Sequence, residues 1–286
     1  MDYFEKYRLE INRALASFLS KQKFGAQKFM AVNRYALLLG GKRVRPLLGL
    51  LAFEIAKNSR TKISRECAIQ ILISIELIHA FSLIQDDLPA LDNDVLRRGK
   101  STAWKKFGEA NALLAGDCLA LLAFKNLADS APTRLLPELT KILADAAATM
   151  TVGQFHDLNL KENSPFKKIL LTHSQKTGAL IAAAAGMGAV LAGANSRQRK
   201  LLVSFAEKIG LAFQIKDDLL DATGDAKLLG KQTRKDVGKK GFVMALGVQK
   251  SQEKLDTLTC AAVEIAQELK SDKLKRLAEF ISTRSK

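Results

Sequence analysis

Residues 64–94 of the chain read SRECAIQILISIELIHAFSLIQDDLPALDND. The Ile-rich part would suit a strand by composition, but about twenty residues without a turn signal are too many for one strand. We therefore expect residues 64–86 to form one long helix, buried at the centre of a helical protein. This helix ends in clustered acid, because Asp86, Asp87, Asp92 and Asp94 fall within nine residues.

That acidic cluster is unfavourable in isolation, since the carboxylates repel one another and the helix dipole already places negative charge at a C-terminus. A bound cation would offset the charge. Oxygen ligands of this kind suit Mg²⁺, which commonly takes one or two carboxylates and completes its shell with water and substrate phosphate. A solvated acidic loop is the alternative. Asp86 and Asp92 would face different sides of a straight helix, so we expect the segment around Pro89 to leave regular helix.

A second apolar helix ends in the same way, with the sequence FQIKDDLLD at 213–221. Asp217 and Asp221 are four positions apart and share a helix face, and Gln214 lies one turn earlier. One acidic helix end is common, but two, each followed by a basic loop, are hard to explain by solvation alone. A facing pair of such helices would hold several metal ions and, through them, a phosphate group.

The formal net charge of +16 indicates an acidic partner, which could be nucleic acid, an anionic membrane or a phosphorylated substrate. A lysine-rich, well-solvated surface is the alternative. Arg offers planar bidentate donors for phosphate, Lys offers a mobile charge, and Gly lets the backbone approach. None of the basic segments has the spacing of a P-loop or of a dinucleotide fingerprint. The segments that combine these residues are GGKRVRP at 40–46, RRGK at 97–100, KTG at 176–178 and residues 230–240.

The composition favours an all-α protein, since the chain is rich in Leu, Ala and Lys and has only 5 Pro in 286 residues. We find no internal repeat, low-complexity run or Gly/Ser linker, so a single domain over residues 1–286 is the simpler organisation. The expected helices are 2–21, 26–39, 43–57, 64–86, 106–129, 134–160, 165–173, 177–194, 197–221, 233–248, 251–270 and 272–284.

Neither long apolar stretch is expected to span a membrane. One carries Glu76 and His79, and the other, residues 180–194, is shorter than the roughly 20 residues that a span needs. The N-terminus lacks the basic and then apolar order of a secretory signal, so we expect a cytoplasmic protein. The 3 Cys are odd in number and far apart, which argues against a disulfide framework or a zinc site.

Taken together, the motifs resemble those of the trans-isoprenyl diphosphate synthases, in the same order and from about residue 30 to the end of the chain. Two extra residues lie between Asp87 and Asp92, and this longer motif is similar to that of the bacterial farnesyl diphosphate synthase type. The motifs that carry the resemblance are GGKRVRP at 40–46, DDLPALDND at 86–94, LRRGK at 96–100, GQFHD at 153–157, KTG at 176–178, FQIKDDLLD at 213–221 and LGK at 229–231.

The resemblance implies one polyprenyl synthase domain, a bundle of roughly ten or more helices around a central cavity, and a homodimer. It also implies an enzyme of isoprene biosynthesis that joins isopentenyl diphosphate head to tail with dimethylallyl or geranyl diphosphate. Mg²⁺ and basic residues would stabilise the departing diphosphate, and the double bond of isopentenyl diphosphate would attack the allylic cation. The released diphosphate would take the proton, so no side-chain nucleophile is expected.

Residue roles follow from the same resemblance. The catalytic set would be Asp86, Asp92, Asp217, Lys176 and Lys231. Asp86 and Asp92 would bind two of three Mg²⁺ ions and Asp217 the third. Asp87, Asp218 and Asp221 would act as partial ligands or behind the ligands. The allylic diphosphate would contact Arg97, Lys176, Thr177, Gln214 and Lys231. Isopentenyl diphosphate would contact Lys42, Arg45, His79 and Arg98.

Product length should depend on how far the growing tail can reach. Phe81 lies five residues before Asp86, roughly 7.5 Å deeper along the helix, and its neighbour Ser82 is small. A Phe there would stop growth after two to three isoprene units, which favours farnesyl diphosphate over geranyl or geranylgeranyl diphosphate. The alternative is that Phe81 packs in the core, away from the substrate.

The sequence departs from the family pattern at three places. Gly241 and Phe242 stand where the family usually has Thr-Tyr, which puts loop closure in doubt. Trp104 occupies a position where the family often has His, and Gln85 precedes the first Asp pair where the farnesyl type often has His. No metal ligand is lost.

Three other classes of protein fit part of the sequence. A class I terpene cyclase would lack the isopentenyl diphosphate site, whereas this chain keeps GGKRVRP and His79. A non-catalytic regulatory subunit of a prenyl synthase tends to lose an Asp motif, and this chain keeps both. A basic, helical nucleic-acid binder would leave both acidic clusters unexplained, so we expect no nucleic-acid partner.

Overall fold

The computed structural model describes residues 4–59, 61–161, 163–223 and 241–284, and these are predominantly helical, which confirms the predicted all-α class. The chain divides into two compact units, Met1–Leu50 with Lys62–Thr140, and Leu51–Thr61 with Lys141–Lys286. The division falls within α3 (Val44–Ala56) and α7 (Leu136–Leu158). A single domain over residues 1–286 stays a prediction.

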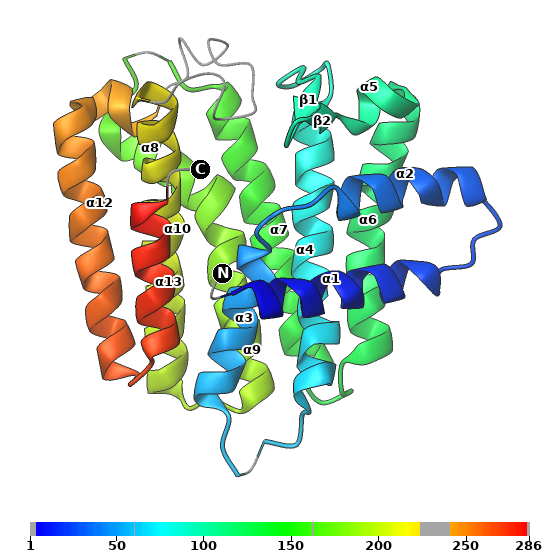
Figure 1. The fold of residues 1–286 in the computed structure, drawn as a ribbon, viewed down its shortest axis with the longest axis horizontal. Helices are drawn as coiled ribbons and strands as arrows, with labels where there is room; N and C mark the ends of the chain where they lie inside the picture. Colours follow the sequence, from blue (N-terminus) through cyan, green and yellow to red (C-terminus); the bar gives the residue numbers. More distant parts are fainter. Residues whose placement is uncertain (1–3, 60, 162, 224–240, 285–286) are drawn as a thin grey trace. The chain divides into compact units, whose positions relative to one another are not determined.

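In the first unit, α4 packs mainly against α6, and α5 and a short hairpin lie at one end of this pair (Figure 1). Its elements are α1 (Glu5–Ser20), α2 (Gln27–Leu38), α4 (Arg65–Asp87), β1 (Leu96–Arg97), β2 (Lys100–Ser101), α5 (Ala103–Phe107) and α6 (Glu109–Ser130).

Helix α4 is the buried central helix that the sequence predicts. Ser64 caps it by accepting a hydrogen bond from the backbone N–H of Cys67 at 3.1 Å. Most of its residues between Ala68 and Ile84 are buried. It ends at Asp87, because the next residue, Leu88, precedes a proline and takes an extended conformation with φ −60° and ψ 150°.

In the second unit, α10 packs against α9 and α12, and α13 covers α12 and α10 (Figure 1). Asn195 caps α10, since its side-chain oxygen accepts from the backbone N–H of Gln198 at 2.9 Å. The elements of this unit are α8 (Phe166–His173), the π-helical turn η1 (Ser174–Gly178), α9 (Ala179–Ala192), α10 (Ser196–Thr223), α12 (Phe242–Glu268) and α13 (Asp272–Thr283).

Three local predictions are wrong. The expected helix 106–129 is broken at Gly108, whose φ of 87° is unfavourable for other residues and separates α5 from α6. Residues 96–101, expected as loop, form the antiparallel hairpin β1–β2. The break expected after residue 248 lies instead at Gly247, where φ is 78° and α12 bends. Residues 233–240 of the expected helix 233–248 lie outside the described residues.

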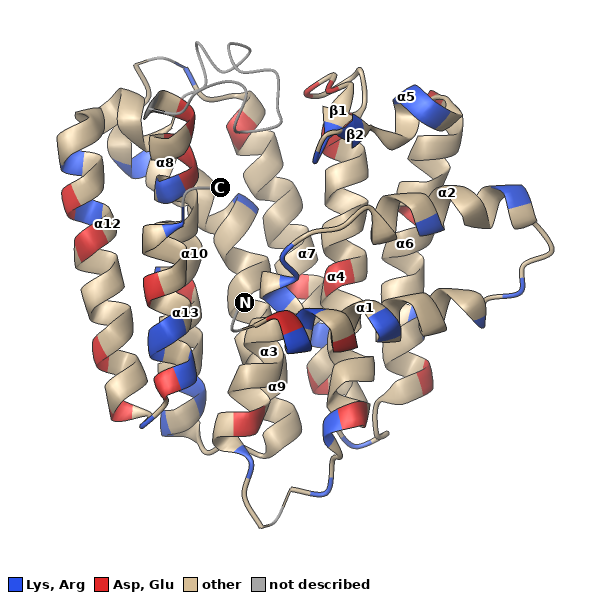
Figure 2. Ribbon diagram, viewed as in Figure 1, with Lys and Arg blue, Asp and Glu red and all other residues tan. Residues whose placement is uncertain are grey.

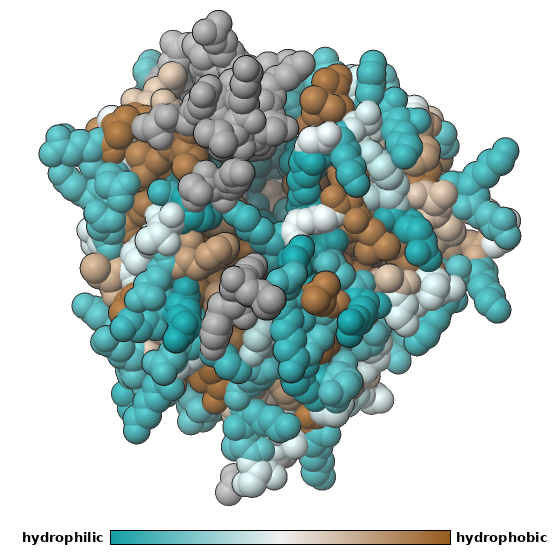
Figure 3. Space-filling view, viewed as in Figure 1, coloured by the Kyte–Doolittle hydropathy of each residue, from teal (hydrophilic) through white to brown (hydrophobic). Residues whose placement is uncertain are grey.

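By length and composition alone, α4 and α6 could each cross a membrane, with mean hydropathies of 2.0 and 1.2. In the apolar 18-residue segments of α4 and α6, 67% and 44% of the segment is buried within the structure. The core helix of a soluble protein can have the same length and composition. The absence of a membrane span therefore stays a prediction. The face of the molecule in Figure 3 is mostly hydrophilic, with separate hydrophobic patches.

Candidate functional site

The acidic segment after α4 turns back on the end of its own helix. The backbone N–H of Asp92 donates to the carbonyl of Asp86 at 2.9 Å, and that of Asn93 donates to the carbonyl of Leu88 at 3.1 Å. Two carboxylates that a straight helix would place on different faces are thus carried by hydrogen-bonded residues. The prediction that the segment around Pro89 leaves regular helix is confirmed.

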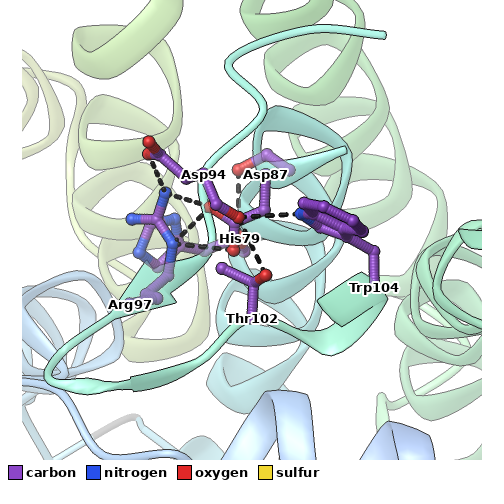
Figure 4. Close-up of polar contacts among 7 residues, drawn as sticks. His79, Asp87, Asp94, Arg97, Thr102 and Trp104 are labelled. Carbon is purple, nitrogen blue, oxygen red and sulfur yellow. Dashed lines mark hydrogen bonds and ion pairs between the residues drawn. The ribbon is translucent and has the colours of Figure 1, made fainter. Parts of the chain in front are cut away.

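Asp87, expected to act behind the metal ligands, is the partner of Arg97 (Figure 4). Arg97 Nε donates to both carboxylate oxygens of Asp87, at 2.8 and 2.9 Å, and its Nη2 lies 3.8 Å from Asp94 Oδ2. Asp87 is 4% exposed, and this burial raises the pKa of its carboxyl group, although the Arg97 hydrogen bond opposes the rise. Arg97, which is predicted to contact the allylic diphosphate, therefore also stabilises the acidic turn, residues 86–94.

The basic segment at 40–46 is built around a buried ion pair. Arg43, for which the sequence predicts no role, is 4% exposed and donates to Glu76 Oε1 at 2.7 Å, to Asn12 Oδ1 at 2.8 Å and to the carbonyl of Leu37 at 2.7 Å. These bonds fix the loop between α2 and α3 against α4. On either side of Arg43, Lys42 is exposed and Arg45 is half-buried, as cations that bind a ligand would need to be.

His79 lies among the cations predicted to bind isopentenyl diphosphate. Its pKa is lowered well below the ordinary value, first by burial and then by the charges of Arg45, Arg98 and Arg43. Arg98 reaches back to the same loop, because its guanidinium donates to the carbonyl of Gly40. A Cβ on Gly41 would lie 2.6 Å from that guanidinium, and Gly41 has φ of 124°, which other residues rarely adopt, so glycine suits this position. Burial and the surrounding positive charge thus both favour the neutral form of the imidazole. Figure 2 shows acidic and basic residues together in the loop and hairpin that follow α4.

In the second unit, the end of α10 carries two aspartates with different partners. Asp217 accepts a hydrogen bond from Arg284 at 2.6 Å, whereas Asp218 accepts from the backbone N–H of Phe242 at 2.7 Å and from Gln214 Nε2 at 2.9 Å. Burial raises the pKa of Asp218 to about 6, and these two hydrogen bonds oppose the rise. Asp218 thus holds the first turn of α12, and Asp221 at the helix end is exposed.

The Gly-Phe pair that replaces the usual Thr-Tyr therefore has a structural explanation. A Cβ on Gly241 would lie 2.3 Å from Asp218 Oδ2, so the close approach of this carboxylate requires glycine. The ring of Phe242 is fully buried against Phe166 and His173. The sequence marked this pair as a departure but gave no sign of its contact with Asp218, which lies 24 positions earlier.

Residues 174–176, expected as a break between the helices 165–173 and 177–194, belong instead to the π-helical turn η1, Ser174–Gly178. Such turns are frequent at functional sites. In this turn Lys176 forms an ion pair with Asp157, and Thr177 Oγ1 donates a hydrogen bond to Gln214 Oε1 at 3.2 Å. A Cβ on Gly153 would lie 2.2 Å from the backbone nitrogen of Lys176, so this glycine lets α7 contact the turn. Lys231, the remaining predicted contact, lies outside the described residues.

The donor set fits Mg²⁺ better than a softer metal. Among the described residues no three His, Cys, Asp or Glu side chains converge as a closed metal site. The acidic positions offer carboxylate oxygens only, and Asp86 and Asp92 are half-buried rather than enclosed. Mg²⁺ is usually held by one or two carboxylates and completed by water and phosphate, so it does not need an all-protein cage.

Similarity to known proteins identifies the class of protein to which this arrangement belongs. The fold is similar to the crystal structure of a geranyltransferase from Helicobacter pylori complexed with magnesium and isoprenyl diphosphate, with a TM-score of 0.82 and 31% identity over 98% of this chain and 96% of that chain. The fold and the two acidic helix ends therefore define an all-α protein of the isoprenoid synthase type, as the sequence predicts.

The sequence pattern of the polyprenyl synthetase family matches residues 26–281, and the chain belongs to that family. It is 38% identical to farnesyl diphosphate synthase of Escherichia coli, over 97% of this chain and 96% of the relative. It is also 40% identical to geranylgeranyl pyrophosphate synthase 4 of Arabidopsis thaliana, over 88% of this chain and 70% of the relative. The protein is accordingly a short-chain prenyltransferase of the trans-isoprenyl diphosphate synthase type.

Proposed function

We propose that this protein is a Mg²⁺-dependent farnesyl diphosphate synthase, which condenses isopentenyl diphosphate with dimethylallyl or geranyl diphosphate. The observation that carries the proposal is the turn in which Asp92 is hydrogen-bonded to Asp86, next to the cations around His79. The solved relative in complex with magnesium and isoprenyl diphosphate supports both the metal and the substrate class.

The residues that would hold Mg²⁺ are Asp86 and Asp92 in the first unit and Asp217 in the second, with three ions bound when substrate is present. Bound Mg²⁺ would neutralise the charge that develops on the departing diphosphate. Lys176, Thr177 and Arg97 would bind the oxygens of the same diphosphate and orient it, with Gln214 behind them. The allylic C–O bond would then break, with both electrons leaving on the diphosphate.

The second substrate would bind at the cations of the first unit. Lys42, Arg45 and Arg98 would bind the isopentenyl diphosphate, and the neutral His79 could donate a hydrogen bond to it without adding charge. The double bond of this substrate would form the new C–C bond to the allylic cation. The resulting cation would lose a proton to the released diphosphate, which restores a neutral product chain.

Product length is proposed to depend on Phe81. This residue is half-buried on α4, and its ring lies beside Gly116 of α6, where a Cβ would meet the ring atom Cδ2 at an ordinary contact distance of 3.6 Å. The hydroxyl of Ser82 donates to the carbonyl of His79 at 2.9 Å and adds little bulk. A ring at this depth favours a C15 product, although the similarity to a geranylgeranyl synthase makes a C20 product the second candidate.

We propose a homodimer because α6 carries large hydrophobic side chains that are exposed. Leu113, Leu114 and Leu121 are exposed there, and Leu114 and Leu121 lie two turns apart on the same side of the helix. Sedimentation of the wild-type protein and of Leu121→Lys tests this, since a monomeric wild type would contradict it. Cytoplasmic location and the absence of a nucleic-acid partner stay predictions.

The activity is tested by incubating the protein with Mg²⁺, labelled isopentenyl diphosphate and either dimethylallyl or geranyl diphosphate, followed by chromatography of the products. We expect a C15 product from both primers. Asp86→Ala and Asp217→Ala should abolish it, whereas Asp145→Ala, whose exposed carboxylate pairs with Lys141, should not. The absence of any elongated product from either primer would refute the proposal.

A further inference from the structure

The acidic turn is held from outside by two neutral donors that converge on one backbone atom. Trp104 Nε1 donates to the carbonyl of Asp94 at 2.7 Å, and Thr102 Oγ1 donates to the same carbonyl at 2.8 Å (Figure 4). Thr102 is itself buried, and its backbone N–H donates to the carbonyl of Val95 at 3.1 Å. Both donors come from the segment directly after the β1–β2 hairpin.

The turn needs such support. Asn93 has φ of 51°, in the left-handed region, which asparagine adopts more readily than most residues other than glycine. Asp86, Asp87, Asp92 and Asp94 also repel one another. The hydrogen bonds from Trp104 and Thr102 reach the carbonyl of the next residue, Asp94, so they fix the backbone directly after this left-handed position.

The charge of the donors is as important as their position. An indole N–H and a hydroxyl carry no net charge, so they hold the backbone of the turn without neutralising its carboxylates. A lysine or arginine at position 104 would instead compete with a metal ion for the same carboxylates. Arg97 already forms such an ion pair with Asp87. The two donors therefore fix the turn and add no positive charge beside Asp86 or Asp92.

We propose that Trp104 is a positioning residue: together with Thr102 it holds the carbonyl of Asp94 and so fixes the turn that presents Asp86 and Asp92 to Mg²⁺ and diphosphate. The assignment rests on the proposed function, since it needs a metal-dependent diphosphate site at this turn. Trp104 would not contact substrate. It would act through the geometry of the backbone between Asp86 and Asp94.

The chain contains one Trp, so its fluorescence reports on this turn alone. The wild-type protein is titrated with Mg²⁺ and dimethylallyl thiolodiphosphate, which resists ionisation, while tryptophan emission is recorded. Calorimetry measures the binding constant in parallel. We expect a saturable change in emission that requires Mg²⁺ and the ligand together, with a midpoint that agrees with calorimetry.

The test variants remove one donor at a time. Trp104→Phe keeps a ring but has no N–H, and it should weaken Mg²⁺-dependent binding of the thiolodiphosphate about tenfold, as expected for one hydrogen bond. Thr102→Val should have a similar effect. Trp104→His, which again offers a ring N–H, should recover most of the affinity. The matched control is Tyr35→Phe, which removes a hydroxyl that donates to the carbonyl of Ser101 at 2.6 Å but does not contact the turn.

The two proposals fail in different ways. If the wild-type protein binds no thiolodiphosphate with Mg²⁺, the proposed function is wrong. If it binds, but Trp104→Phe and Thr102→Val bind as tightly as Tyr35→Phe, the positioning role is overturned. A lower thermal midpoint in the variants with unchanged binding also overturns it, because that result indicates a structural role only.

Discussion

Arg284 Nη2 lies 2.6 Å from Asp217 Oδ1 and donates to the carbonyl of Phe213 at 3.0 Å. Its guanidinium also lies over the Phe213 ring, 3.8 Å from the ring centroid. The arginine side chain is 5% exposed and that of the aspartate 38%. The residue after α13 thus binds α10 at the aspartate proposed to hold a metal ion, and it orients one carboxylate oxygen.

Arg284→Met should therefore destabilise the protein. The change keeps much of the apolar stem but removes the ion pair and the bond to the Phe213 carbonyl, so we expect a loss of roughly 1–3 kcal/mol in urea unfolding. Arg197→Met is the matched control, because its pair with Glu268 is on the surface and it is 80% exposed. The control should change stability by less than about 0.5 kcal/mol. Equal losses in the two variants would contradict a special role for Arg284.

Gly241→Ala should loosen the start of α12. The new Cβ would lie 2.3 Å from Asp218 Oδ2, so the carboxylate must withdraw from the N–H of Phe242, and we expect a loss of about 1–2 kcal/mol. Gly186→Ala in α9 is the comparison, since its Cβ would meet Val203 at an ordinary 3.8 Å. Thermal unfolding of the pair checks this, and a Gly241→Ala protein as stable as Gly186→Ala would show that Asp218 has room to move.

The sequence predicts what is local. The apolar run of α4, its acidic end and the break before Pro89 are each encoded within a few residues, and the structure contains all three. The pairing of charges is different, because it depends on which segments the fold brings together. Asp217 and Arg284 are 67 positions apart, and nothing near either residue indicates the other. Likewise, the sequence marks Trp104 as unusual without naming the carbonyl that it binds.

Stability should fall on mild acidification because of His173. This residue is 7% exposed, and its two ring nitrogens have no hydrogen-bond partner among the residues that the structure describes. Burial lowers its pKa to about 4; the charge of Asp157 opposes this shift and that of Lys176 adds to it. The unfolded chain binds a proton near pH 6.5 while the folded chain does not. The contribution is therefore fully present above pH 6.5 and is lost as the pH falls through about 4.

Urea unfolding between pH 7 and pH 4.5 checks this with His173→Phe. The variant keeps a ring against Phe242 but cannot bind a proton, so its stability should fall less steeply than that of the wild type. The full difference over the interval down to pH 4 is of order 3 kcal/mol. Because His79 titrates in both proteins, the difference between them isolates His173. Parallel pH profiles would show that the imidazole finds a partner or solvent when it is charged.

The length of the product tests whether the growing chain lies along α4 and reaches Phe81. Phe81→Ala removes the ring that lies against the position of Gly116, and if the chain grows along α4 the product should shift from C15 to C20 or longer. Ser82→Ala is the matched control, since it removes only the hydroxyl bonded to the carbonyl of His79. Products are compared by chromatography under the same Mg²⁺ and substrate concentrations. An unchanged C15 product from Phe81→Ala, with normal turnover, would place the ring in the core and assign product length to other residues.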